Sequence, residues 1–121
     1  MTEHCTFGAA PDQMGGGVLR LQGEIGLEQA KTVHHALVQA LSQTSRLLID
    51  LSQVTTVDLT LVQLLLAARR SAAEQGKALC LRAPGPSPIV QQTAAAAGFP
   101  MTAHAWLGLP IVEGKECRNE C

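Results

Sequence analysis

The segment 46–74 constrains the fold of this chain more than any other part of the sequence. Residues 47–49 (Leu-Leu-Ile) form an apolar run, which is typical of a strand buried on both faces. The polar stretch 52–57 is expected to be a loop, and Asp58 is a residue type that helix N-caps prefer. A helix is predicted from there to about Glu74. A doubly buried strand followed by a helix predicts a parallel α/β sheet, because parallel neighbours need a crossover connection.

The rest of the chain supplies further elements of both kinds. Alternating or extended patterns predict strands at 5–7, 18–23, 77–83 and 101–106. One helix is expected over 27–41, and another over 87–97 with Ser87 as its N-cap and Pro88 in its first turn. In the first helix the apolar residues recur every three or four positions and should share one face: Leu27, Ala30, Val33, Leu37, Ala40 and Leu41.

The composition restricts the partners. The chain has 121 residues, of which 46% are hydrophobic and only 2% aromatic, so its core must be aliphatic. The formal net charge of -1 leaves neither the basic stripe typical of nucleic-acid binding nor a polybasic membrane-surface segment. The N-terminal residues lack a signal-peptide pattern, and no apolar run reaches the length of a membrane span. We therefore expect a cytoplasmic protein that binds no nucleic acid and does not insert into a membrane.

The histidines and cysteines form no recognisable catalytic or metal-binding pattern. His34 and His35 are adjacent on a predicted helix, where neighbours project about 100° apart, so they do not chelate a metal together. His104, Cys117 and Cys121 lack a fourth ligand at regular spacing. The four cysteines show no CxxC spacing, and a cytosolic location would keep them reduced. We expect no metal site and no disulfide framework.

Phosphate-binding and carboxylate chemistry are equally poorly supported. The glycines at 15–17 resemble a phosphate loop only superficially, because a strand rather than a helix follows and no Lys-Ser or Lys-Thr accompanies them. Asp50 and Asp58 are the only paired carboxylates in the most patterned region, but a predicted loop separates them and Asp58 is explained as a helix cap. We therefore expect no catalytic residue and no cofactor, and predict that the chain is not an enzyme.

The helix that begins at Asp58 carries the features most informative about function. Its first N–H groups lack intrahelical partners, so a hydroxyl at this positive end is well placed to carry a phosphate. One face of the helix should meet the sheet and contains Leu61, Leu64, Leu65, Ala68 and Ala72. A broadly opposite face contains Leu59, Val62 and Leu66, beside Gln63 and Arg70. This second stripe is covered either by the helix 87–97 or by a partner protein, and both interpretations remain open.

Residues 21–25 (LQGEI), 48–54 (LIDLSQV) and 57–58 (VD) occur in this order, followed by Gly76 and by 97–99 (AGF). In order and spacing they resemble the STAS family, the domain shared by sulphate transporters and anti-sigma-factor antagonists. The resemblance covers roughly residues 15–105. It implies an α/β fold with a mixed sheet of four to five strands and helices packed on one face. A single domain is expected over 1–121, with its core at about 15–106 and a loosely ordered tail at 108–121.

The resemblance also implies a function. Stand-alone STAS proteins resemble switches: unphosphorylated they bind an ATP-dependent serine kinase that is also an anti-sigma factor, and phosphorylated they release it. The phosphoacceptor of the family is a Ser or Thr directly after the Asp that begins the second helix, and Leu59 stands at that position here. Thr60, one residue later, is therefore the candidate acceptor, and Thr55 and Thr56 lie just before Asp58.

The predicted function is thus a regulatory module that binds an anti-sigma factor, a serine kinase or a related signalling protein. The predicted partner-binding surface comprises Thr56, Asp58, Leu59, Thr60, Val62, Gln63, Leu66 and Arg70. An alternative is an accessory STAS subunit that binds the ATPase of a phospholipid ABC transporter. A third interpretation is a nucleotide or small-ligand sensor, but no phosphate-binding loop in the sequence supports it.

Overall fold

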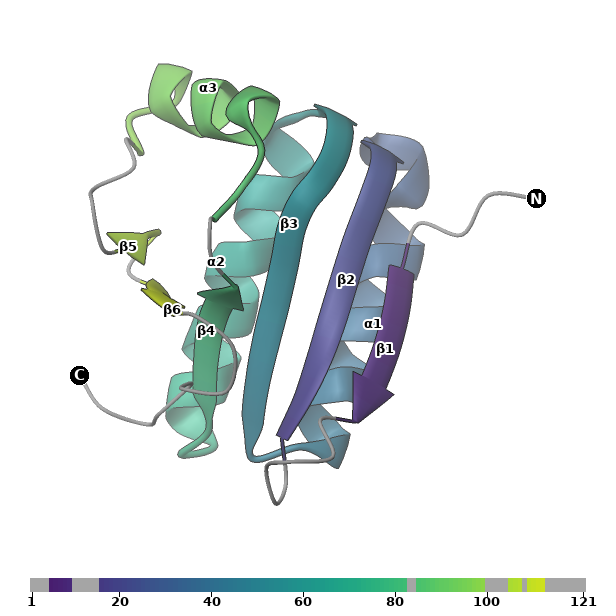
Figure 1. Cartoon of the computed structure of the whole chain (residues 1–121), viewed down its shortest axis with the longest axis vertical. Helices are drawn as coiled ribbons and strands as arrows, with labels where there is room; N and C mark the ends of the chain where they lie inside the picture. The colour runs from purple at the N-terminus through teal and green to yellow at the C-terminus, as the bar shows by residue number, and fades with distance from the viewer. Residues whose placement is uncertain (1–4, 10–15, 83–84, 100–104, 108, 113–121) are drawn as a thin grey trace.

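Six strands form one sheet, in the order β1-β2-β3-β4-β6-β5 (Figure 1). The computed structural model describes residues 5–9, 16–82, 85–99, 105–107 and 109–112. The strands are β1 (Cys5–Ala9), β2 (Gly16–Ile25), β3 (Arg46–Val57), β4 (Ala78–Arg82), β5 (Ala105–Trp106) and β6 (Leu109–Val112). The helical elements are the 3₁₀ turn η1 (Leu27–Gln29) and the helices α1 (Ala30–Gln43), α2 (Leu59–Glu74) and α3 (Pro88–Ala96).

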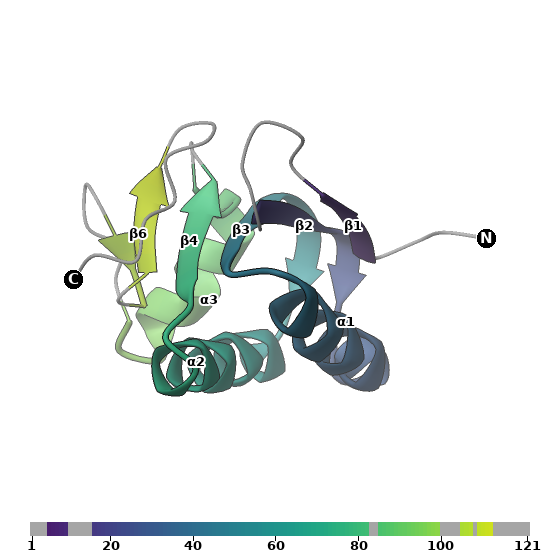
Figure 2. The same cartoon turned by 90° about the horizontal axis from the view of Figure 1, so that it is seen from below.

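The sheet is mixed, as expected from the sequence. Strands β2, β3, β4 and β6 run parallel to one another, while β1 pairs antiparallel with β2 and β5 antiparallel with β6. Helices α1 and α2 lie side by side against one face of this sheet (Figure 2). The predicted fold class, an α/β fold with a mixed sheet and helices packed on one face, is therefore confirmed. The sheet has six strands instead of the expected four to five, because β6 forms from a segment that was expected to be part of the tail.

The two faces of the sheet have different surroundings because side chains alternate along each strand. In β3, Leu47, Ile49 and Leu51 belong to the main aliphatic core, together with buried residues of α1 and α2. Leu48 points to the other face, where it clusters with Ala78 and Cys80 of β4. The apolar run of β3 is thus buried on both sides, as its composition predicted.

The expectation of a loop over 52–57 was wrong, because β3 continues to Val57. Its second half stays paired with β2, from Gln22 beside Gln53 to Ile25 beside Val57. Val54 is buried among the core residues while the residues on either side of it are more exposed. The polar composition of this half therefore marks a strand that is covered on one side only.

The C-terminal region also differs from the prediction. Residues 109–112, expected to lie in a loosely ordered tail, form strand β6, which pairs with β4 at Leu81 and Arg82. Leu109 is buried in the main core, and this burial favours an ordered strand even though Pro110 lacks a backbone donor. Of the strand expected over 101–106, the structure describes the end as β5. The rest of that stretch and the tail 113–121 lie outside the described residues.

The ends of the helices follow their predicted signals with one exception. Gly76 after α2 and Gly98 after α3 have φ values of 69° and 96°, the left-handed conformation that glycine adopts without strain. Ser87 stands at the N-cap of α3, but its hydroxyl donates to the carbonyl oxygen of Val54 at 2.7 Å instead of capping the helix. This bond ties the start of α3 to β3. No helix in the described parts of the chain is long and apolar enough to cross a membrane.

One cysteine departs from the expectation of reduced thiols. Cys80 is fully buried on β4 and is disulfide-bonded. The spacing of cysteines in the sequence could not show this, because a disulfide depends on which side chains the fold brings together.

Candidate partner-binding site

Asp58 joins two helical N-termini through its carboxylate. It is the N-cap of α2, and its Oδ1 accepts a hydrogen bond from the backbone N–H of Thr60 at 2.9 Å. Its Oδ2 accepts a second bond, from the backbone N–H of Leu27 at the start of η1, at 3.0 Å. The cap predicted from the sequence is confirmed, and the structure adds a contact across 31 residues of chain. The carboxylate therefore sets the position of η1 relative to α2.

The residues around Leu27 complete this junction. Gln29 closes a capping box with Gly26: the Gln29 Oε1 accepts from the Gly26 N–H at 2.8 Å, and the Gln29 N–H donates to the Gly26 carbonyl at 3.0 Å. A Cβ on Gly26 would lie 3.4 Å from the Asp58 Oδ2, an ordinary van der Waals contact, so Gly26 lies directly beside this carboxylate. The 3₁₀ turn is thus held from both ends.

Leu27 was placed incorrectly by the helical pattern. It was expected on the buried face of the first helix, yet its side chain is 74% exposed. The reason is that α1 begins only at Ala30, so Leu27 belongs to η1 and does not share the helical phase of Val33 and Leu37. The result is an exposed aliphatic side chain beside Asp58 that was missing from the predicted surface. The preceding Gly26, a residue that commonly interrupts helices, was the only sequence signal for it.

Leu59 and the threonines lie on the other side of Asp58. Leu59, the first residue of α2, is 42% exposed. Thr60 is half-buried in the first turn of α2, and Thr55 and Thr56 are exposed near the end of β3. Leu27, whose backbone bonds to the Asp58 carboxylate, and Leu59, the next residue after Asp58, are therefore both exposed aliphatic residues adjoining Asp58.

Further along α2, one residue of the predicted surface proves to be in the core. Val62 is only 1% exposed and shares the main core with Val90 and Ala94 of α3, so it cannot contact a partner. Of the two open interpretations of the outer stripe, packing within the domain is thus correct for Val62. Leu66 is half-buried and also packs against this core.

The remaining members of the predicted surface stay accessible. Gln63 and Arg70 are exposed on α2. The surface that the structure leaves available at this end of the molecule, called the α2 surface below, consists of Leu27, Thr56, Asp58, Leu59, Thr60, Gln63, Leu66 and Arg70.

The opposite flank of α2 faces α1 across a shallow groove of about 170 Å³. The groove is lined mainly by aliphatic side chains, namely Leu37, Val38 and Leu41 of α1 with Leu64, Ala67 and Ala68 of α2, and by His34, Ser71 and Gln75. Helix α2 therefore has its two sides occupied by α1 and by the core residues shared with α3. Its exposed residues run along the helix, from Leu59 at its start through Gln63 to Arg70.

Catalytic or metal-binding groupings do not emerge from the described residues. No three of their His, Cys, Asp and Glu side chains lie together as metal ligands would. His34 and His35 are both exposed on α1, and His104, Cys117 and Cys121 lie outside the described residues. Asp50 and Asp58 do not act as a pair: Asp58 bonds to backbone N–H groups, whereas Asp50 contacts Ser52 and two arginines.

Comparison with known proteins gives the class of protein that this fold and surface define. The family described as "Mlab, STAS domain" matches residues 10–101, which is most of the chain. The chain therefore belongs to the STAS domain family, as the motifs in its sequence indicated. No curated protein matches the chain in sequence.

Solved structures support the same fold. The anti-sigma factor antagonist SpoIIAA in its unphosphorylated form is 18% identical, with a TM-score of 0.64 over 92% of this chain and 90% of that one. The Bacillus cell fate determinant SpoIIAA in its phosphorylated form is 18% identical, with a TM-score of 0.62 over 92% and 93% of the two chains. A protein of Thermotoga maritima described as an anti-sigma factor antagonist is 14% identical, with a TM-score of 0.63 over 93% and 87%. At these identities the likeness shows that the chain shares the fold of these proteins.

Proposed function

We propose that this chain is a protein-binding module that acts by partner switching, in the manner of an anti-sigma-factor antagonist, and that the α2 surface is where it binds. The observation that carries the proposal is the exposure of two aliphatic residues that adjoin Asp58: Leu27, which is bonded to it through its backbone N–H, and Leu59, which follows it in the chain. Exposed apolar patches rimmed by polar residues mark sites of protein–protein contact. The carboxylate bonds that hold η1 against α2 keep the two leucines in a fixed arrangement, which lowers the entropic cost of binding.

The residue at position 59 limits how phosphorylation can control binding. A leucine cannot be phosphorylated, so the binding surface of this chain stays apolar at the position where the family carries its acceptor. Thr60 remains the candidate acceptor, because it lies in the first turn of α2 at the positive end of the helix dipole. A phosphate there would lie close to the Asp58 carboxylate, and repulsion between these negative charges would disturb the α2 surface.

Partner binding is tested with Leu59→Asp and Leu27→Asp, measured by calorimetry against anti-sigma factors and serine kinases from the same organism. Each substitution places a charge among apolar contacts and is expected to weaken binding about 100-fold or more, equivalent to about 3 kcal/mol. Val38→Asp is the matched control, because Val38 is also an exposed aliphatic residue on a helix but lies on α1. Equal loss of binding in all three variants, or no loss in any, would contradict the proposed surface.

Control by phosphate is tested separately, by incubating the chain with ATP and the kinase and locating phosphate by mass spectrometry. Thr60→Ala should remove the modification, whereas Thr55→Ala should retain it. A chain that binds its partner but is never phosphorylated would be a constitutive binder, and the switching half of the proposal would then be rejected. Binding to an ABC-transporter ATPase, with no binding to any anti-sigma factor or kinase, would favour the accessory-subunit alternative instead.

A further inference from the structure

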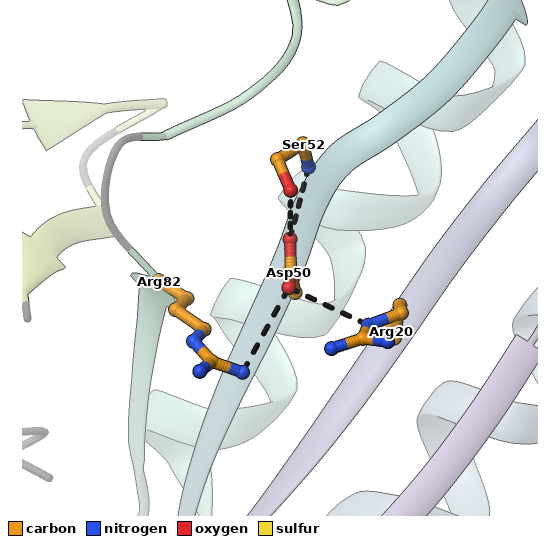
Figure 3. Close-up of polar contacts among 4 residues, drawn as sticks. All are labelled: Arg20, Asp50, Ser52 and Arg82. Carbon is orange, nitrogen blue, oxygen red and sulfur yellow. Dashed lines mark hydrogen bonds and ion pairs between the residues drawn. The ribbon is translucent and has the colours of Figure 1, made fainter. Parts of the chain in front are cut away.

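Two arginines and an aspartate lie side by side on the sheet face opposite α1 and α2 (Figure 3). Arg20 of β2 is the direct register partner of Asp50 of β3, and Arg82 of β4 follows Leu81, which pairs with Ile49. Because neighbouring strands are only about 4.8 Å apart, residues at matching positions on three strands bring their side chains together. The Arg20 Nε and the Arg82 Nη1 lie 3.6 Å and 3.9 Å from the same Asp50 Oδ2.

Asp50 is firmly held at the centre of this cluster. Its side chain is 9% exposed, and its Oδ1 accepts hydrogen bonds from the hydroxyl and the backbone N–H of Ser52, at 2.7 Å and 3.0 Å. A buried carboxylate needs a compensating cation, and one arginine would neutralise it. The second arginine is therefore not needed to neutralise Asp50, and the cluster of two arginines and one aspartate carries a net charge of about +1.

Both guanidinium groups remain able to bind something else. The Arg20 and Arg82 side chains are 47% and 41% exposed. Their distances to Asp50 exceed the roughly 3.2 Å limit of a well-formed N–H···O bond, so neither contact with Asp50 is a close hydrogen bond, and each guanidinium carries five N–H donors in all. Within the described parts of the chain, Asp50 is the only carboxylate that pairs with either arginine.

We propose that Arg20 and Arg82 form a binding site for a monovalent oxyanion, a carboxylate or a phosphodiester, on the sheet face opposite α1 and α2. The two guanidinium groups approach the same Asp50 oxygen from the strands on either side, so an oxyanion bound beside Asp50 would lie near both. Each planar guanidinium can bind such a group with two parallel hydrogen bonds. A single negative charge balances the excess of one. A dianion would overcompensate it and would be repelled by Asp50. The site lies on the other side of the sheet from the helices, so it is independent of the α2 surface.

The site is tested by NMR titration of the arginine Nε–H signals with sodium acetate and, separately, with sodium dimethyl phosphate. Ionic strength is held constant with sodium chloride, because exposed charges are screened by any salt. We expect saturable shifts of the Arg20 and Arg82 signals and none of the Arg69 signal, since Arg69 is exposed on α2. Inorganic phosphate at pH 8, where it is a dianion, should bind more weakly than either monoanion.

Variants establish that both arginines bind the ligand. Arg20→Gln and Arg82→Gln should each weaken the affinity about tenfold or more, monitored on the arginine that remains, because a charge-assisted bond is lost. Arg69→Gln is the matched control and should leave the affinity unchanged. Amide spectra verify the fold, and Arg82→Lys, which keeps the charge but loses the fork, should give an intermediate affinity.

The outcomes separate the two ligand types from no site at all. Saturation by acetate alone identifies a carboxylate ligand, and saturation by dimethyl phosphate alone identifies a phosphodiester. Saturation by both supports a general site for monovalent oxyanions. The proposal is overturned if sodium chloride produces the same shifts, if Arg69 shifts in parallel, or if neither glutamine variant changes the affinity.

Discussion

Substitutions of Asp58 measure how much its two hydrogen bonds contribute to the stability of the domain. Asp58→Ala removes the acceptor for the Thr60 N–H and the acceptor for the Leu27 N–H together. Loss of a helix N-cap costs about 1 kcal/mol, with a range of roughly 0.5–2. Loss of the hydrogen bond to Leu27 adds about 0.5–1.5 kcal/mol. Because Asp58 is exposed, water can replace part of what is lost, and we expect the free energy of unfolding to fall by about 1–3 kcal/mol.

Asp58→Asn divides this effect in two. Asparagine caps helices about as well as aspartate, so its amide oxygen can keep the bond to Thr60. Its amide NH₂ group then faces the Leu27 N–H, and two donors cannot bond to each other. The expected order of stability is wild type, then Asp58→Asn, then Asp58→Ala, with the asparagine variant about 1 kcal/mol below wild type.

Urea denaturation measures these differences, since unfolding free energy falls linearly with urea concentration in a small two-state domain. Glu28→Ala is the control, because Glu28 is an exposed acidic residue in the same turn as Leu27, and its loss should change stability by less than about 0.5 kcal/mol. Asp58→Ala within about 0.5 kcal/mol of wild type would refute the reasoning. An asparagine variant as unstable as the alanine variant would show that the two bonds are not separable.

Two further substitutions test the placement of side chains by the fold. Val62→Asp should unfold the domain or lower the free energy of unfolding by about 3 kcal/mol or more, because it buries a charge in the main core. Leu59→Asp, at an exposed position, should leave the melting temperature within a few degrees of wild type. Equal stability of the two variants would place Val62 on the surface. Ser87→Ala should cost about 1–3 kcal/mol in urea denaturation, because the buried Val54 carbonyl loses its hydroxyl donor; a neutral result would mean that water or another group replaces the bond.

Local signals along the chain were sufficient for most of the secondary structure. The Asp58 cap, the glycine stops at Gly76 and Gly98, and the apolar run 47–49 all depend on interactions within a few residues. Such interactions are encoded by neighbouring side chains, so they can be inferred without the fold. The family motifs, whose order and spacing indicated a STAS domain, lie largely in these same segments.

Contacts between distant segments decided the rest of the architecture. The polar stretch 52–57 is a strand because β2 runs beside it, and residues 109–112 are a strand because β4 does. In both cases the strand forms because a neighbouring strand pairs with its backbone, although the local sequence alone does not predict a strand there. Ser87 likewise has the sequence of a helix cap, but the nearby Val54 carbonyl takes its hydroxyl.

The sequence by itself determined that a capped helix follows a buried strand in an aliphatic α/β domain, and that Leu59 stands where a phosphoacceptor would be expected. Only the tertiary structure decided which side chains around that helix are accessible. Val62 is buried because the core also reaches the α3 side of α2, and Leu27 is exposed because η1 precedes α1. It also brought Arg20 and Arg82 to one carboxylate oxygen from separate strands. Accessibility and charge pairing depend on the relative positions of elements far apart in sequence, and no local pattern records those positions.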